Sequence, residues 1–228
     1  MSKIKDTNLR DRIYETIRNK ILKLDFQPGE RIPELQLSEE LGVSRPLIRE
    51  ATRRLSWEGL VEIHPNYGAK VIIIDDKTIQ DLAFVRWQHD QLAIPLAIFN
   101  ASYKDITDLR NIANSCITAN VSGNIELRHD SDALFHQRIF QLSGNHILCD
   151  LHYRTSLIVR LWQAIHITTP ETLASGLQQH LELVDYIEQR NITAALQVIH
   201  DHTMLSFGSD FTGDLLSPQD LLQLCQSN

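Results

Sequence analysis

The sequence predicts a mainly α protein with two domains. The first is an N-terminal winged helix-turn-helix with a small β-hairpin wing, and the second is a C-terminal antiparallel all-α helical bundle. Residues 33–71 read as a short helix, a tight turn, a second helix and a hairpin. From Asp75 onwards helical periodicity continues with short breaks, and short connections make consecutive helices antiparallel. We therefore place the first domain at residues 1–74, a hinge at 75–77 and the second domain at 78–228.

The first expected helix covers residues 9–24, because aliphatic side chains recur there on one face. The members of this face are Ile13, Ile17, Ile21 and Leu24. Residues 27–30 then include a Pro-Gly pair, which breaks regular structure before the next helix.

The next two helices are predicted from the signals around the turn between them. Leu37 and Leu41 lie one turn apart in a short helix near residues 33–41. Gly42 follows, where a left-handed residue ends a helix without a Cβ penalty. Ser44 is expected to cap the second helix, with its hydroxyl accepting an N–H of the first turn. The core stripe of that helix is formed by Ile48, Ala51 and Leu55.

Arginines line the other face of this second helix. At about 100° per residue, Arg45, Arg49 and Arg53 share one face. Three guanidiniums on one face suit bidentate contacts to guanine edges or to phosphates in the DNA major groove. The alternative is a solvated charge stripe with Glu50 and Glu58 as partners.

A β-hairpin wing is expected after the second helix. The apolar runs LVEI and KVII are joined by residues 64–69, and Gly68 supplies turn freedom at the tip. A wing in this position can touch the DNA backbone or minor groove beside the reading helix.

The second domain is expected to be helical throughout. We predict helices near residues 78–100, 105–121, 125–142, 146–166, 170–189 and 192–207, with a short tail helix near 218–225.

Four polar residues of this domain are predicted to meet. Asp132 and His136 lie four apart on one helix face, while His180 and His202 lie within the apolar stripes of their helices. The two histidines are about equally far from the turn near residues 190–191, so an antiparallel pair sets them at similar height. One carboxylate and three imidazoles suit a divalent metal, with zinc, nickel and manganese all suitable. The alternative is that each histidine is a hydrogen-bonded core residue.

Charge and composition are compatible with a nucleic-acid partner. The formal net charge is −7, but residues 1–74 carry 13 Lys or Arg and 11 Asp or Glu, while residues 75–228 carry 9 and 18. The acidic excess therefore lies in the second domain. The N-terminus has no apolar core for a secretory signal, no membrane span is indicated, and three widely spaced cysteines fit a reduced chain. We therefore expect a cytoplasmic protein with no membrane partner.

Residues 9–74 resemble the winged helix-turn-helix of the GntR family of bacterial transcription regulators. The matching segments are PGERI at 28–32, LGVSR at 41–45, the RE-A pattern at 49–51, EGLV at 58–61 and the wing glycine at 68. The resemblance implies DNA recognition through Arg45 and Arg49, with wing contacts around Gly68. Two departures are Leu35, where some members carry a basic residue, and Tyr67, where arginine is usual before the wing glycine.

Residues 78–207 resemble the all-helical effector domain of the FadR branch of this family, in its metal-binding subgroup. The matching features are Arg86, DALFH at 132–136, SGN at 143–145 and the interval from His180 to His202 with Ala194-Ala195 between. The resemblance implies that the four predicted residues hold one metal and that a small carboxylate metabolite binds there, with Arg86 as its second anchor. Arg160 is a further candidate for an effector-binding cation.

These features lead to the hypothesis of a ligand-responsive, DNA-binding transcription regulator, with repression as the favoured mode. A homodimer would place two reading helices on a near-palindromic operator. One alternative is a regulator that senses the metal itself, or whose metal is structural, with no organic effector. A more distant alternative is a metal-dependent enzyme.

Overall fold

The computed structural model describes residues 2–166 and 170–207. The described residues group into two compact units, one containing residues 2–74 and 154–166, the other residues 75–153 and 170–207. The mainly helical fold, with a two-stranded hairpin near the N-terminus and a helical C-terminal part, agrees with the predicted fold class. Within the described residues, no helix combines the length and apolarity needed to cross a lipid bilayer.

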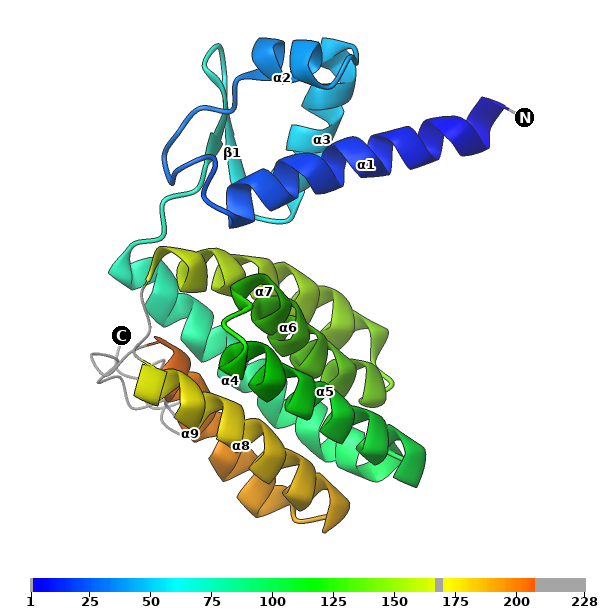
Figure 1. Cartoon of the computed structure of the whole chain (residues 1–228), viewed down its shortest axis with the longest axis vertical. Helices are drawn as coiled ribbons and strands as arrows, with labels where there is room; N and C mark the ends of the chain where they lie inside the picture. Colours follow the sequence, from blue (N-terminus) through cyan, green and yellow to red (C-terminus); the bar gives the residue numbers. More distant parts are fainter. Residues whose placement is uncertain (1, 167–169, 208–228) are drawn as a thin grey trace, which may run out of the picture. The chain divides into compact units, whose positions relative to one another are not determined.

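The N-terminal unit contains three helices and a hairpin before residue 75 (Figure 1). These elements are α1 (Ser2–Leu22), α2 (Glu34–Glu40), α3 (Arg45–Trp57), β1 (Val61–His64) and β2 (Gly68–Val71).

Helix α1 buries the predicted aliphatic face only in part. Ile13, Ile17 and Ile21 are buried, as is Tyr14 beside them. The prediction that Leu24 continues this face was wrong. Helix α1 ends at Leu22, and Leu24 adopts a left-handed backbone with φ +61°, so its side chain leaves the helical stripe and is only half-buried.

The turn between α2 and α3 forms as expected, with Gly42 at φ +63°. Ser44 occupies the N-cap position of α3, but the prediction that its hydroxyl caps the helix was wrong. Residue Pro46 has no N–H to donate, and the N–H of Leu47 already donates to the carbonyl oxygen of Ser44 at 3.0 Å. Neither of the two N–H positions from which a capping hydroxyl normally accepts is therefore available to Ser44. The core stripe was predicted correctly, since Ile48, Ala51 and Leu55 are all buried.

The wing is a short antiparallel hairpin in which Val61 pairs with Val71 and His64 with Gly68. The second strand begins two residues earlier than the KVII run suggested. Asn66 at the tip and Gly68 at the first position of β2 both have positive φ, at 66° and 83°. The left-handed conformation that closes the wing is thus shared between an asparagine and the predicted glycine.

After residue 75 the described chain forms six helices that match the predicted ones, and all but the second half of α7 group in the C-terminal unit (Figure 1). They are α4 (Asp76–Asn100), α5 (Tyr103–Val121), α6 (Ile125–Leu142), α7 (His146–Ile165), α8 (Pro170–Glu188) and α9 (Ile192–Phe207). The tail helix predicted near residues 218–225 lies outside the described residues. Polar side chains define the helix starts: Asp75 accepts from the Thr78 N–H, and Ser102 and Asp105 form a reciprocal capping box.

Helix packing in this unit brings together residues that are distant in sequence. Helix α4 packs against α6 and α9, α5 packs against α6 and α8, and α8 packs against α9. The shared core includes Ile94, Leu109, Phe135, Val184 and Ala195, all without solvent exposure. The tight turn between α8 and α9 uses Arg190 at φ +56°, so these two helices run back along each other. This arrangement sets the histidines of α6, α8 and α9 in one layer.

Candidate metal centre and nucleic-acid interface

The structure brings the four predicted metal-site residues together from three helices. One donor atom from each of Asp132, His136, His180 and His202 lies within 4.8 Å of every other. The Asp132 Oδ1 atom is 3.5 Å from His180 Nε2 and 4.0 Å from His136 Nε2. The His136 and His180 rings form a T-shaped pair and the His202 ring is tilted against both, with centroids 4.6 to 5.1 Å apart. This spacing leaves the ring nitrogens facing a common point.

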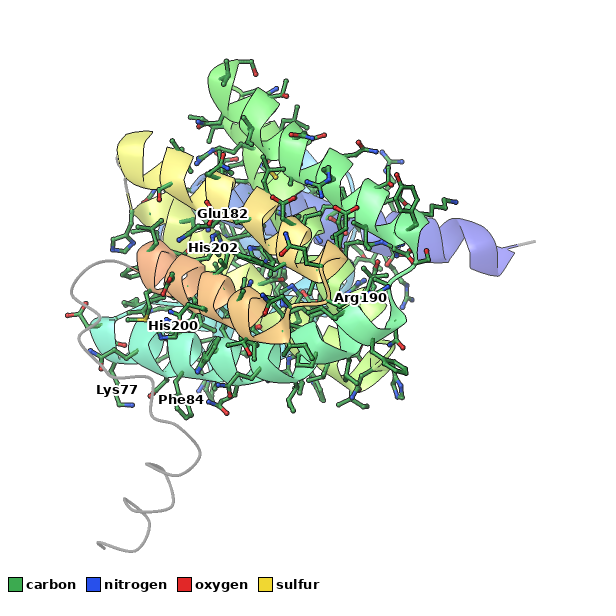
Figure 2. The ribbon with its side chains drawn as sticks, turned by 90° about the horizontal axis from the view of Figure 1, so that it is seen from below. Lys77, Phe84, Glu182, Arg190, His200 and His202 are labelled. Carbon is green, nitrogen blue, oxygen red and sulfur yellow. The ribbon has the colours of Figure 1, made fainter. Side chains whose placement is uncertain are left out.

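The cluster requires that the His202 side chain point from α9 into the helical bundle. Figure 2 labels His202 and His200 on α9, and they lie on different sides of that helix, His202 towards α8 and His200 towards α4. The His200 ring meets Trp87 of α4 edge-on, with centroids 5.1 Å apart. A Cβ added at Gly176 of α8 would lie 3.7 Å from His202 Cε1, so the backbone of α8 contacts this ring directly.

The three histidines are held in the neutral form that coordinates metal ions. Burial is the main cause: it lowers the pKa of His180 and of His202 to about 3, and the pKa of His136 well below its usual value. The positive charge of Arg86 lowers all three pKa values further. Neutral imidazoles present lone pairs at neutral pH without having to release a proton.

The residues present fit a divalent metal ion. Although His180 is buried, neither of its ring nitrogens makes a hydrogen bond within the described part of the chain, and the same holds for Nδ1 of His202. Buried polar atoms without partners are unusual in proteins. The alternative, that each histidine is a hydrogen-bonded core residue, therefore does not describe His180. A metal ion would satisfy these nitrogens, and three nitrogens with one carboxylate oxygen form a donor set typical of zinc and neighbouring ions.

Arg86 lies inside the bundle close to this cluster. Its side chain is buried, and its Nε donates to Asp90 Oδ2 at 3.2 Å. Burial raises the pKa of Asp90 to about 6, opposed by the adjacent guanidinium. Arg86 is therefore a buried residue and not a surface one, and Asp90 is the carboxylate that it pairs with. Arg86 is thus a buried cation whose charge acts on every histidine of the cluster.

The predicted DNA-reading face of α3 is open to solvent. Arg45, Arg49 and Arg53 are exposed, and Ser44 is exposed at the start of the helix. The Nε of Arg49 pairs with Glu34 Oε2 of α2 at 2.9 Å, an exposed contact that orients the guanidinium and that phosphate can replace.

The carboxylates proposed as partners of this stripe pair elsewhere. Glu50 binds Arg10 of α1 at 2.5 Å, while Glu58 accepts from the Tyr14 hydroxyl at 2.6 Å and from Arg54. Arg54 also lies over the Tyr14 ring, 3.7 Å from its centroid. Among the described residues, Glu50 and Glu58 are therefore not the partners of Arg45, Arg49 and Arg53, although this face of α3 is exposed.

Comparison with known proteins decides the family. Residues 85–204 match the family model of the FCD domain, and residues 9–71 match that of the bacterial regulatory proteins of the gntR family. The Nta operon transcriptional regulator of Aminobacter aminovorans is 30% identical over 171 residues, covering 72% of this chain and 77% of that protein. The chain belongs to the GntR family.

Other relatives of this GntR-family chain also match it over most of their own length. The HTH-type transcriptional regulator YdhC of Bacillus subtilis is 26% identical over 202 residues, covering 86% of this chain and 87% of that protein. Among solved structures, E. coli McbR/YncC superposes with a TM-score of 0.75 at 18% identity, covering 96% and 98% of the two chains. A GntR regulator from Rhodococcus sp. RHA1 gives 0.74 at 20% identity, covering 87% and 95%.

The general function follows from membership of the GntR family. The GntR-family chain is a DNA-binding transcription regulator with a helical FCD domain, and its family is one of regulators and not of enzymes. The metal-dependent enzyme considered above is therefore excluded.

One polar residue of the FCD domain was missed by the sequence reasoning. The sequence assigns no role to His152, which is buried on α7 and stacks on Phe140 of α6, with ring centroids 4.0 Å apart. Burial lowers the pKa of His152 well below its usual value, and Arg86 and His89 lower it further. The signal was its position four residues after the buried Leu148, on one face of α7.

Arg160 remains a prediction. It is half-buried on α7, in the half of that helix grouped with the N-terminal unit, and it takes part in an interaction within the protein.

Proposed function

We propose that this GntR-family regulator binds one divalent metal ion through Asp132, His136, His180 and His202, and that a small carboxylate metabolite bound there alters its operator affinity. The observation that carries the proposal is the convergence of four donor atoms within 4.8 Å of one another, among them buried imidazole nitrogens without hydrogen bonds. Zinc best suits three nitrogens and one oxygen, with nickel and manganese as further candidates.

The protein supplies a second anchor for the effector. When bound, the metal supplies positive charge and open coordination positions for a carboxylate. Among the described residues, Asp90 is the only hydrogen-bonding partner of Arg86, and it occupies Nε alone. The two Nη groups therefore remain for an acid, and a guanidinium can hold a carboxylate through two parallel hydrogen bonds. Arg160 is proposed as a further cation for the same ligand.

DNA reading is assigned to the exposed face of α3 and to the wing. Arg45, Arg49 and Arg53 would contact base edges and phosphates, with Ser44 and Gly68 at the edges of the contact. Exposure of all three guanidiniums supports this assignment. A homodimer on a near-palindromic operator would use two such faces, one per half-site.

A second copy of the chain also explains the outer face of α4. Residues 91–99 contain no charged side chain, and a helix that is apolar all round is normally buried. On this stretch Leu92 is 58% exposed and Phe99 86% exposed, with Leu96 between them on the same face. An apolar stripe of this kind suits an isologous dimer contact between two α4 helices.

Effector and operator would be coupled through the dimer. An acid that binds one dimer geometry better than another shifts the population towards it, and thereby changes the spacing of the two reading helices. Linkage is reciprocal, so operator DNA must change the affinity for the acid by the same factor. Repression is the proposed mode.

The first test is metal content. Purified tag-free protein, analysed by plasma mass spectrometry beside the His136→Ala, His180→Ala double variant, should contain about one metal per chain, lost in the variant. Wild-type protein that takes up no zinc, nickel or manganese on incubation would refute the site. The effector step is tested by fluorescence anisotropy on operator DNA with a panel of small carboxylic acids. If acids that bind the protein never change its DNA affinity, the coupling is wrong.

A second candidate function keeps the metal and removes the acid. Asp132 is the most exposed member of the cluster, and even its side chain is only 21% exposed, while His180 is 1% exposed. Because these side chains are so little exposed, the site also suits a regulator that senses the metal itself, or a metal with a structural role. Metal-dependent DNA binding with no organic ligand would favour sensing, and metal removable only by unfolding would favour a structural role.

A further inference from the structure

A segment ahead of α2 is attached to the wing as an additional strand-like edge. The Gly29 N–H donates to the Val71 carbonyl at 2.9 Å, and the Ile32 N–H donates to the Ala69 carbonyl at 2.9 Å. Between them Arg31 forms an antiparallel bridge with Lys70 of β2. The backbone position of Arg31 is thus fixed beside the wing, although the residue precedes the helix-turn-helix in sequence.

The side chain of Arg31 lies directly against Gly68. A Cβ built on Gly68 would be 3.4 Å from Arg31 Nε, 3.6 Å from Nη2 and 3.9 Å from Cζ. These distances correspond to ordinary van der Waals contact, so the guanidinium packs beside the wing backbone at Gly68. Gly68 is favoured by its left-handed backbone at φ +83°, and this backbone is the surface that the Arg31 guanidinium faces.

Arg31 is also free of acidic partners. Its side chain is exposed, while the neighbouring Ile32 is buried, as expected from alternation along an extended segment. Among the described residues Arg31 forms no ion pair. The nearby carboxylates are used elsewhere: Glu30 accepts from the Gln27 N–H at 2.7 Å, and Glu62 lies 3.2 Å from His64 Nε2.

The wing itself has no cation at its tip. The connecting residues are Pro65, Asn66 and Tyr67, and none of them can form an ion pair with phosphate. An exposed guanidinium held against the wing backbone, with no carboxylate to neutralise it, has the chemistry required for a phosphate contact.

We propose that Arg31 is the phosphate-binding cation of the wing and contacts the DNA backbone next to Gly68. The inference rests on the family's DNA-binding role and on the assignment of α3 as the reading helix. Phosphate contacts fix the register of a protein on DNA without reading sequence. Arg31 thereby positions the wing, while α3 reads bases.

The test is fluorescence anisotropy with the full chain on a duplex selected by the wild-type protein from a random-sequence library, and on an unselected duplex of equal length. Arg31→Ala should weaken binding to both duplexes by roughly three- to tenfold, and should reduce the slope of log affinity against log salt by about 0.9. Arg31→Lys should retain the slope, because it keeps the charge. Arg12→Ala, which removes an exposed arginine of α1, is the matched control and should bind like wild type.

A reading-helix variant separates this inference from the assignment on which it rests. Arg45→Ala, Arg49→Ala should lose the preference for the selected duplex. If that variant loses the preference while Arg31→Ala keeps wild-type affinity and slope, the wing inference is overturned and the reading helix stands. If the double variant keeps the preference, the assignment of α3 fails instead.

Double-mutant analysis tests the contact with Gly68. Gly68→Ala strains the left-handed backbone at φ +83° and so shifts the wing segment beside Arg31. Its loss of DNA affinity and that of Arg31→Ala should therefore be less than additive. Additive losses would overturn the placement of Arg31 against Gly68. Far-UV circular dichroism and thermal melting of each variant establish that the fold is retained.

Discussion

His180 Nε2 lies 3.5 Å from Asp132 Oδ1, although the two residues come from different helices, α8 and α6, and His180 makes no hydrogen bond within the described residues. Phe135 stacks on the His180 ring, with centroids 4.3 Å apart, and so holds its plane. A buried imidazole that packing orients towards a carboxylate, with both nitrogens unbonded, is prepared for a ligand that the protein itself does not provide.

The first prediction concerns this histidine. His180→Ala should lower zinc affinity by at least about a hundredfold, because it removes one of four donor atoms. Competition with a chromogenic chelator measures the affinity. His200→Ala, on the side of α9 that faces Trp87 of α4 and not the cluster, is the matched control and should bind zinc like wild type. Equal affinity in all three proteins would contradict the proposed donor set.

The second prediction is a pH dependence of the metal-free protein. His180 and His202 have pKa values of about 3 in the folded state, below the usual 6.5, so the unfolded state binds more protons between these limits. Stability should therefore be complete above about pH 6.5 and fall as pH decreases towards 3. Urea unfolding of chelator-treated protein at several pH values measures this slope, which His180→Phe should reduce. A slope unchanged by His180→Phe would show that this histidine is not the titrating group.

The third prediction concerns base reading by α3. Arg45→Ala should cost about 1–3 kcal/mol on the selected operator and relax the preference at one base position. Arg54→Ala should leave the preference unchanged, because that guanidinium lies over the Tyr14 ring and binds Asp11. Operator selection repeated with each variant measures the preference. A preference that changes in Arg54→Ala and not in Arg45→Ala would reverse the assignment of the two faces.

The fourth prediction concerns the dimer. Leu92→Glu, Phe99→Glu should convert the protein to monomer at micromolar concentration, because charges on the exposed apolar face of α4 cannot be buried against a second copy. Val121→Glu, at an exposed apolar position at the end of α5, is the control and should leave the oligomeric state unchanged. Light scattering after size exclusion measures the mass. A dimer that persists in the α4 variant would place the contact elsewhere.

The fifth prediction concerns the anchor of α1. Tyr14→Phe should lower the free energy of unfolding by about 1–2 kcal/mol, because it leaves Glu58 without the hydroxyl that donates to it at 2.6 Å. Urea titration measures the loss. Thr16→Val removes a hydroxyl that makes an exposed hydrogen bond to the Arg12 carbonyl within α1, and it is expected to change stability by less than about 0.5 kcal/mol. Equal losses would mean that the contact between α1 and α3 does not depend on this hydrogen bond.

Local patterns explain why much of the site could be predicted. The positions of Asp132 and His136 are set by one helical turn, and the matched distances of His180 and His202 from the turn at Arg190 follow from helical rise. Each of these inferences needs only regular helices and an antiparallel pair. The prediction of Leu24 failed for the complementary reason, since a single left-handed residue ended the regularity on which the pattern depends.

By itself, the sequence determined which segments are helices and hairpin, which face of each helix is apolar, and which family the chain resembles, because these depend on neighbours along the chain. Only the tertiary structure decided the contacts between elements. Arg86 became a buried partner of Asp90 inside the bundle, His152 entered the core, and Arg31 came to lie against Gly68. Periodicity in the sequence predicts the direction in which a side chain points from its own backbone. The residues that the side chain contacts belong to the element packed opposite, and only the folded chain determines which element that is.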